Sequence, residues 1–359
     1  MLYFFLTRLQ FLDTLFNVFR YITVRTGLAL VTAFLVVALL GPRVIRRLTV
    51  LKFGQPIRDD GPSTHLAKTG TPTMGGILIV AAMVFAALLW CDLSNGYVHT
   101  ILFVTVGYGA VGFADDYLKI KKKNAKGFSG KNKIVVEAAI GLAAILYLTY
   151  MGTGDTRLMV PFFKRVMPDL GVFYLILALV VMLGSSNAVN LTDGLDGLAI
   201  LPTVLVAGTY GTFAYLVGRT DASQYLYIPY IRGAGELTVY CGAIIGAGLG
   251  FLWYNCHPAE VFMGDVGALS LGGAIGTVAV VSKHELALLL VGGIFAAEAL
   301  SVILQVGYFK LTGGKRIFKM APLHHHFEQL GWPEEKVIVR FWIIQVLLAL
   351  AGLATLKLR

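Results

Sequence analysis

The chain has 359 residues, of which 57% are hydrophobic and only 14% are charged, and its mean hydropathy is +0.75. This composition excludes an ordinary soluble domain and indicates a polytopic membrane protein. In such a protein the net charge of +10 indicates basic cytoplasmic loops with an affinity for anionic lipid or phosphate, and no nucleic acid is expected as a partner. The three cysteines form neither a CxxC pair nor a disulfide framework.

The expected fold class is all-α, a single transmembrane domain over residues 1–359. Residues 1–25 are aromatic and amphipathic, which predicts an interfacial helix rather than a cleavable signal. Uncharged runs of spanning length then predict a bundle over 26–356. We expect its ten transmembrane helices near 26–42, 73–91, 97–114, 138–154, 170–192, 197–218, 237–256, 266–282, 286–309 and 341–356.

An even number of spans places both termini on one side of the membrane. The loops opposite the termini are then 43–72, 115–137, 193–196, 257–265 and 310–340. The first, second and last of these hold most of the lysines and arginines of the chain. The positive-inside rule therefore predicts that these loops are cytoplasmic and that both termini are external.

Two adjacent carboxylates, Asp115 and Asp116, follow the uncharged run 97–114 and precede the basic stretch 119–133. Neighbouring carboxylates repel each other unless a cation or a proton lies between them. A solvated helix end is the simpler interpretation of the pair. The other unusual polar sequences fall on the same predicted face, however, and this convergence favours one cytoplasmic active site.

The segment 68–76 offers Lys68, three threonines including Thr73, and a Gly-Gly pair at a helix start. These residues suit close approach of the backbone to a phosphate, since helix N-termini attract anions. The order of glycine and lysine is not that of a Walker A loop. A plain helix cap is the alternative.

The segment 190–197 packs one amide, two carboxylates and two glycines into a loop too short to leave the membrane surface. Asn187 and Asn190 are spaced i, i+3 and share a helix face, and Asp193 and Asp196 follow them. This set can bind a nucleobase, a ribose or the water shell of a magnesium ion. A tight turn between two spans is the alternative.

Asp265 begins the eighth predicted span, and we expect it to be the direct protein ligand of Mg²⁺, which takes one or two carboxylates. The alternative is a favourable contact with the helix dipole. His324, His325 and His326 are consecutive and lack the i, i+4 zinc spacing, so we expect them to donate to phosphate. Glu298 lies within a span, and it is a functional-site candidate or a packing partner of a neighbouring helix.

Together these motifs resemble a known family. Lys-Thr-Gly-Thr-Pro-Thr-Met-Gly-Gly, Phe-Ala-Asp-Asp-Tyr, Asn-Leu-Thr-Asp-Gly-Leu-Asp-Gly, Phe-Met-Gly-Asp-Val-Gly and Pro-Leu-His-His-His-Phe-Glu occur in order between about residues 58 and 340. They are similar to those of the bacterial phospho-N-acetylmuramoyl-pentapeptide transferases (translocase I), a branch of the polyprenyl-phosphate N-acetylhexosamine-1-phosphate transferases.

The resemblance implies a ten-helix enzyme of the bacterial cytoplasmic (inner) membrane, embedded in membrane lipid with its active site facing the cytoplasm. It would transfer phospho-MurNAc-pentapeptide from UDP-MurNAc-pentapeptide to undecaprenyl phosphate, giving lipid I and UMP for peptidoglycan synthesis, with Mg²⁺ as cofactor. The resemblance also implies a homodimer, on which the sequence itself is silent.

The resemblance also implies roles for the motif residues. The catalytic residues would be Asp115, Asp116, Asp265 and His324, with Asp265 as the metal ligand and Asp115 orienting or deprotonating the acceptor phosphate. The uridine side of the donor would be held by Asn190, Asp193, Asn255 and Phe262. The remaining substrate-binding residues would be Lys68, Thr73, Lys119, Lys131, Lys133, Asn187, Asp196, His325 and His326.

Two other functions are compatible with the sequence. A transferase of the same chemistry could take UDP-GlcNAc as its donor. A secondary transporter could use Glu298 and the aspartates as an ion path, but transporters carry polar sites near the bilayer midplane in two matching halves. The polar motifs of this chain gather at one predicted face and no halves match.

Overall fold

The computed structural model describes residues 1–8, 14–51, 70–122, 127–153, 155–163 and 166–358. Within these ranges the fold is helical and contains no strand. The elements in chain order are α1 (Leu2–Arg8), η2 (Thr14–Arg20), α2 (Ile22–Val50), α3 (Gly76–Trp90), α4 (Gly96–Lys122), α5 (Gly130–Leu148), η4 (Thr149–Thr153), α6 (Phe173–Thr192), α7 (Ile200–Val217), α8 (Thr220–Leu226), α9 (Glu236–Asn255), α10 (Gly264–Val281), α11 (Ala287–Val291), α12 (Gly293–Leu311), α13 (Leu323–Gln329) and α14 (Glu334–Ala354).

In the described part of the chain, nine helices are long and apolar enough to cross a membrane. They are α2, α4, α5, α6, α7, α9, α10, α12 and α14, and each overlaps a predicted span. The remaining predicted span, 73–91, corresponds to α3, an apolar helix of 15 residues, which is about 22 Å long at 1.5 Å per residue. The multi-pass membrane class is thus confirmed, and the count of ten stays a prediction.

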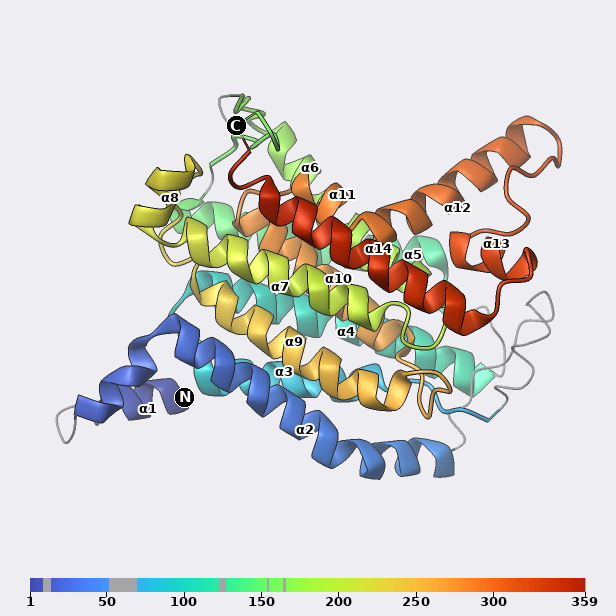
Figure 1. Cartoon of the computed structure of the whole chain (residues 1–359), viewed down its shortest axis with the longest axis horizontal. Coiled ribbons are helices and arrows are strands. Elements are labelled where there is room, and N and C mark those ends of the chain that lie inside the picture. Colours follow the sequence, from blue (N-terminus) through green and yellow to red (C-terminus); the bar gives the residue numbers. More distant parts are fainter. Residues whose placement is uncertain (9–13, 52–69, 123–126, 154, 164–165, 359) are drawn as a thin grey trace.

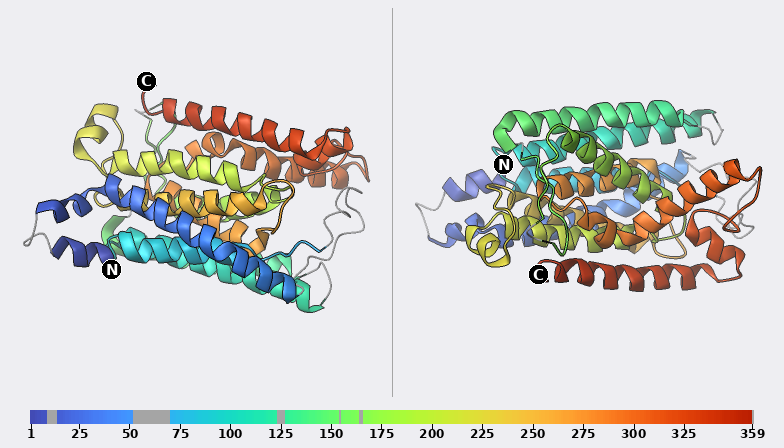
Figure 2. Two further views of the ribbon diagram at one scale, coloured as in Figure 1. Left: turned by 60° about the horizontal axis from the view of Figure 1, so that its bottom comes forward. Right: turned by 90° about the horizontal axis from the view of Figure 1, so that it is seen from above.

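The long helices run between two ends of the bundle (Figures 1 and 2). Both chain termini and α8 lie at one end, which we call the terminal end. The C-terminal ends of α2, α4 and α9, together with α13, lie at the opposite end, which we call the motif end (Figure 1). The two termini therefore lie at the same end of the bundle (Figure 1), and on which side of a membrane they lie stays a prediction.

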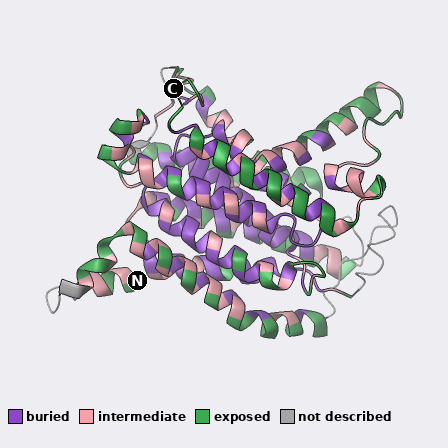
Figure 3. Cartoon of the chain, in the orientation of Figure 1, coloured by how far each residue is buried: buried purple, intermediate pink, exposed green. Residues whose placement is uncertain are grey.

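The core of the bundle is α10, every residue of which is buried. It packs between α4 and α6, while α9 packs against α2 and α7. Buried residues fill the centre of the bundle, and exposed residues follow the outer helices and the terminal segments (Figure 3). The outer helices carry exposed apolar side chains, such as Leu39 and Ile303, each 65% exposed, as expected where a helix faces lipid.

The structure corrects the predicted N-terminal helix. Two short elements, α1 and η2, stand in place of one helix over 1–25, and α2 already begins at Ile22. Arg25, the last residue of the predicted interfacial segment, lies within α2. It is buried and forms a two-point ion pair with Glu236 of α9, so it belongs to the bundle.

Several predicted loops are partly helical. α4 continues through Asp115 and Asp116 to Lys122, and α5 begins at Gly130, so much of the predicted loop 115–137 is helix. The loop 310–340 contains α13 and the start of α14, and the predicted span 286–309 is broken at Gly292 between α11 and α12. The predictions marked where apolar runs end, and a helix can continue into water beyond that point.

Candidate functional site

Asp115 and Asp116 lie in the second-last turn of α4, and both side chains are buried. Each carboxylate accepts a hydrogen bond from the backbone of another segment. The Phe128 N–H donates to Asp115 Oδ1 at 2.5 Å, and the Val266 N–H donates to Asp116 Oδ2 at 3.3 Å. The chain after α4 and the start of α10 therefore hold the two carboxylates in fixed positions.

Asp265 lies in the first turn of α10 and is also buried. Gly264 before it has φ +71°, and a Cβ there would lie 2.6 Å from Asp116 Oδ2. Gly112 of α4 packs against the Asp265 backbone, and a Cβ at Gly112 would collide with the Asp265 carbonyl. These two glycines let α4 and α10 approach until one oxygen from each of the three aspartates lies within 4.8 Å of the others.

Two lysines compensate the charge of the three aspartates. Lys119 Nζ lies 2.5 Å from Asp115 Oδ2, 3.2 Å from Asp265 Oδ2 and 3.8 Å from Asp116 Oδ1. Lys133 Nζ, from α5, lies 2.8 Å from Asp265 Oδ2. We call these three aspartates and two lysines the aspartate cluster. Buried charges are tolerated when they are paired and hydrogen-bonded in this way.

Asn190 of α6 joins the aspartate cluster. With its amide oriented to satisfy both neighbours, its nitrogen donates to Asp265 Oδ1 at 3.2 Å and its oxygen accepts from Lys133 Nζ at 2.9 Å. The amide orientation is assigned from this network of donors and acceptors. Residues from α4, α5, α6 and α10 therefore converge on one point at the motif end.

The segment before α3 packs beside the site formed by these residues. The Phe262 N–H donates to the Pro72 carbonyl at 2.8 Å, and the Gly75 N–H donates to the Phe262 carbonyl at 2.9 Å. Thr73 between them is buried, and its Oγ1 has no hydrogen-bond partner in the described structure. Thr73 and Phe262 are thus brought beside the aspartate cluster. Lys68 lies outside the described residues.

Asp193 follows α6 beside the aspartate cluster. Burial of its carboxyl, together with the nearby Asp265 carboxylate, raises the pKa of Asp193 to about 7, although the Gly264 N–H opposes the shift. The negative charge of Asp265 disfavours a second negative charge on the nearby Asp193 carboxyl. Asp193 therefore holds its proton to a higher pH than an ordinary aspartate does.

Asp196 of the α6–α7 turn and Asn255, the last residue of α9, join this turn to the loop after α9. Asp196 Oδ2 lies 3.1 Å from His257 Nδ1 and accepts from the Ala259 N–H at 3.0 Å. Asn255 Oδ1 accepts from the Gly197 N–H at 3.1 Å, and its amide nitrogen donates to the Val261 carbonyl at 2.9 Å. Asp196 and Asn255 thus fasten the turn to the loop after α9.

The three histidines of α13 point to different neighbours. His324 is buried, its Nδ1 lies 3.1 Å from Glu298 Oε1, and its Nε2 faces Gly194, where a Cβ would collide with it. His325 Nδ1 lies 2.7 Å from Glu328 Oε2. His326 Nδ1 accepts from the Lys319 N–H at 3.1 Å. Among the three, His324 reaches the turn that carries Asp193.

The structure therefore groups the predicted residues unevenly. The aspartate cluster, Asn190, Thr73, Phe262 and Asp193 lie together, and His324 contacts the adjacent Gly194. Lys131 is exposed at the start of α5, and His325 and His326 bond within the 310–340 segment. Asn187 donates from its amide to Glu137 Oε2 at 2.8 Å.

Three polar residues near these motifs were missed by the sequence reasoning. They are Glu137, His257 and Glu334. Glu137 is the last residue of the predicted loop 115–137, so the rule that singled out Glu298 within a span did not reach it; only the structure shows that α5 already begins at Gly130. Glu334 bonds to the Asp196 N–H at 3.1 Å, a contact between residues far apart in sequence that no local pattern predicts.

The aspartate cluster has the chemistry of a divalent-cation site. Mg²⁺ prefers carboxylate oxygens, and Asp116 Oδ1 is buried without a hydrogen-bond partner. The Lys119 ammonium sits among the three carboxylates, where a positive charge is favoured. A second group of possible ligands lies near the α6–α7 turn. One ligand atom from each of its members lies within 4.8 Å of the others, and the members are Asp196, His257 and Glu334.

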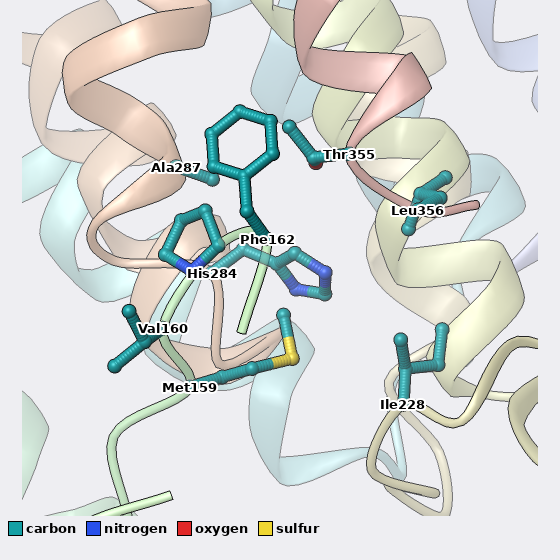
Figure 4. Close-up of a pocket in the computed structure, with 9 residues that line it drawn as sticks. Met159, Val160, Phe162, Ile228, His284, Ala287, Thr355 and Leu356 are labelled. Carbon is teal, nitrogen blue, oxygen red and sulfur yellow. The ribbon is translucent and has the colours of Figure 1, made fainter. Parts of the chain in front are cut away.

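A small cavity at the terminal end has a different character (Figure 4). Its lining is largely apolar and consists of Met159, Val160, Pro161, Phe162, Ile228, His284, Ala287, Thr355 and Leu356. None of these residues belongs to a predicted motif, and the lining offers no carboxylate. The cavity is therefore no part of the site built around the aspartates.

Comparison with known proteins decides the family. The profile described as Glycosyl transferase family 4 matches residues 98–283, and the Phospho-N-acetylmuramoyl-pentapeptide-transferase signature 1 matches residues 68–80. A protein of Desulfatibacillum aliphaticivorans named phospho-N-acetylmuramoyl-pentapeptide-transferase is 57% identical over 360 residues, which cover the whole of both chains. The chain belongs to the phospho-N-acetylmuramoyl-pentapeptide transferases.

Membership of this family confirms the resemblance carried by the motifs and decides against the transporter alternative. The chain is a transferase and a multi-pass membrane protein. The signature over residues 68–80 includes Thr73, which the structure places against the aspartate cluster. The segments that carry the resemblance are therefore those that the fold gathers at the motif end.

Proposed function

We propose that the chain transfers phospho-MurNAc-pentapeptide from UDP-MurNAc-pentapeptide to undecaprenyl phosphate, releasing UMP and leaving lipid I in the membrane. The observation that carries this proposal is the aspartate cluster with its two lysines, in a chain similar along its whole length to a protein named for this reaction. Transfer of a phosphoryl group requires mainly positioning and neutralisation of negative charge, and this cluster is equipped for both.

In the proposed reaction an oxygen of the lipid phosphate attacks the phosphorus that carries the sugar. The bond from this phosphorus to the oxygen bridging to UMP breaks, and UMP leaves. Asp115 would orient the acceptor phosphate or take its proton, and Lys119 and Lys133 would neutralise the phosphate oxygens. We favour direct attack over a covalent phospho-aspartate, because transfer between phosphates needs no protein nucleophile.

We propose Mg²⁺ as the cofactor, with Asp265 as its direct ligand and Asp116 beside it. When bound, the ion would polarise the pyrophosphate and make UMP a better leaving group. Lys119 would then move from between the carboxylates toward the substrate phosphates. The donor nucleoside would lie along Asn190, Asp193 and Phe262, and His324 would approach the phosphates from the side of Gly194.

The donor can be tested directly. Purified protein with undecaprenyl phosphate and Mg²⁺ is expected to release UMP from UDP-MurNAc-pentapeptide and little from UDP-GlcNAc. Equal rates with the two donors would contradict the assignment of the MurNAc donor and leave a phosphosugar transferase. Omission of Mg²⁺ with a chelator should abolish release, and full release in the chelator would contradict the cofactor assignment.

We also propose that the motif end faces the cytoplasm of a bacterial inner membrane and that both termini are external. The exposed Lys131 and the exposed Asp221 of α8 lie toward the two ends of the bundle. In a cysteine-free background, Asp221→Cys should react with an impermeant maleimide in intact cells, whereas Lys131→Cys should react only after lysis. Labelling of Lys131→Cys from outside would reverse the topology. The homodimer implied by the resemblance can be tested by light scattering in detergent.

A further inference from the structure

Glu137 is a buried carboxylate of α5 for which the sequence motifs assign no role. Its side chain is fully buried, while the preceding Val135 is 65% exposed and Val136 is 39% exposed. α5 therefore lies at the periphery of the bundle and turns this one acidic side chain inward. A buried carboxylate in a membrane protein is costly unless another polar group pairs with it.

The neighbour of Glu137 is Asn187 of α6. The Asn187 amide nitrogen donates to Glu137 Oε2 at 2.8 Å and to the Leu183 carbonyl at 3.0 Å, so both of its hydrogens are used within the protein. Glu137 Oε1 is buried and has no hydrogen-bond partner in the described structure. Because an unsatisfied buried oxygen is destabilising, this pair is a poor device for stability alone.

A second contact between the same two helices lies one turn nearer the motif end. Lys133 precedes Glu137 by four residues on α5, and Asn190 follows Asn187 by three residues on α6. Both spacings place side chains on one helix face. Lys133 Nζ and the Asn190 amide oxygen are 2.9 Å apart, and both residues contact Asp265.

The two helices are thus joined by two successive polar pairs, Glu137–Asn187 and Lys133–Asn190, and the second pair ends on Asp265. We propose that Glu137 is a positioning residue of the transfer site. By holding Asn187, it fixes the rotation of α5 against α6, so that Lys133 and Asn190 meet on Asp265. This inference rests on the roles proposed above for Asp265 and Lys133.

Apolar packing between α5 and α6 is already supplied elsewhere. Ile145, Ala178 and Met182 belong to one buried apolar cluster at these helices. Apolar contacts press two helices together, but they tolerate small rotations better than a hydrogen bond does. The Glu137–Asn187 pair adds a directional contact between the two helices, one turn from the Lys133–Asn190 contact.

The test compares Glu137→Ala with Ile145→Ala, a buried apolar truncation on the same helix. A misplacement of about 1 Å caused by a substitution away from the chemistry can lower a rate by about 100-fold, so Glu137→Ala is expected to lower kcat by about tenfold or more with little change in KM for the donor. Glu137→Gln keeps an oxygen acceptor for Asn187 and should retain most of kcat. Ile145→Ala should lower the melting temperature and leave kcat nearly unchanged.

Exchanging the donor and the acceptor of the Glu137–Asn187 hydrogen bond tests positioning separately from stability. Asn187→Asp alone sets one carboxylate against another and should lower kcat strongly. Adding Glu137→Gln restores the hydrogen bond with donor and acceptor exchanged, and kcat should recover by about tenfold as the positioning is restored. Absence of recovery, or a Glu137→Ala kcat equal to that of Ile145→Ala, would overturn the proposal.

Lys133→Ala and Asp265→Asn, measured in the same assay, separate this inference from the proposed function. If both variants remain active, the proposed transfer site is wrong. If both are inactive while Glu137→Ala resembles Ile145→Ala, the site stands and only the positioning role of Glu137 fails.

Discussion

The Glu298 carboxylate holds His324 through two contacts at once. Glu298 Oε1 accepts from the His324 backbone N–H at 3.2 Å and lies 3.1 Å from the imidazole Nδ1, while Oε2 accepts from the Leu323 N–H at 2.6 Å. A carboxylate of α12 therefore caps the first turn of α13 and orients its buried histidine. The sequence left Glu298 as either a functional candidate or a packing partner, and the geometry links it to the histidine motif.

This relationship predicts that Glu298 and His324 act as a unit. Glu298→Ala leaves the buried His324 N–H and the partly buried Leu323 N–H without an acceptor, which costs about 1–3 kcal/mol for the buried group, and it frees the imidazole to turn. We expect Glu298→Ala and His324→Ala each to lower turnover strongly, and the double variant to be little worse than either. The checks are kcat and melting temperature, compared with Leu304→Ala, which is on the same helix and 55% exposed. Additive losses would show that the two residues act independently.

Asp265 is the residue on which the most contacts of the site converge, since Lys119, Lys133 and Asn190 all reach it. Asp265→Asn removes one negative charge and keeps the size of the side chain. Because electrostatic stabilisation dominates this kind of chemistry, we expect turnover to fall by about 100-fold or more while the protein stays folded. Asp221→Asn, an exposed aspartate of α8, is the control. Near-normal turnover of Asp265→Asn at ordinary Mg²⁺ would remove Asp265 from the metal site.

Much of the fold follows from the sequence because the bilayer constrains it. A lipid environment requires backbone groups to be satisfied within each helix, so uncharged runs locate α7, α9 and α10 closely. Two features were missed for different reasons. α8 is short and polar, so no apolar run marks it, and the break at Gly292 lies within a continuous apolar run that gives no sign of an interruption.

The candidate site could be predicted as a list of residues but not as a geometry. Aspartates at three helix ends indicated one face, and the structure brings Asp115, Asp116 and Asp265 within 4.8 Å. That closeness depends on Gly112 packing against the Asp265 backbone, a tertiary contact across more than 150 residues. The position of Lys133 depends in the same way on how α5 packs against α6, which periodicity does not encode.

The raised pKa of Asp193 predicts a pH dependence of stability. Its pKa of about 7 in the folded protein lies above the ordinary value of about 3.9. Between these values the folded protein binds more protons than the unfolded protein, so this residue makes stability fall as pH rises. Asp193→Asn stays neutral throughout, and its melting temperature should fall less between pH 4 and pH 7 than that of the original protein, without added divalent cation. Equal falls in the two proteins would contradict the raised pKa.

The ion pair between Arg25 and Glu236 predicts a loss of stability without a loss of chemistry. Two guanidinium nitrogens lie 2.7 and 2.6 Å from the two carboxylate oxygens, and Glu236 Oε2 also accepts from the Asp92 N–H at 3.0 Å. Arg25→Met leaves the Glu236 charge buried and unpaired, which costs about 3–5 kcal/mol. Adding Glu236→Gln removes that charge and keeps an acceptor for the Asp92 N–H, so the double variant should regain much of the lost thermal stability.

Because the ion pair joins the start of α2 to the start of α9 at the terminal end, folded Arg25→Met protein should keep its kcat. A double variant less stable than Arg25→Met, or a kcat that falls in step with melting temperature, would contradict this account.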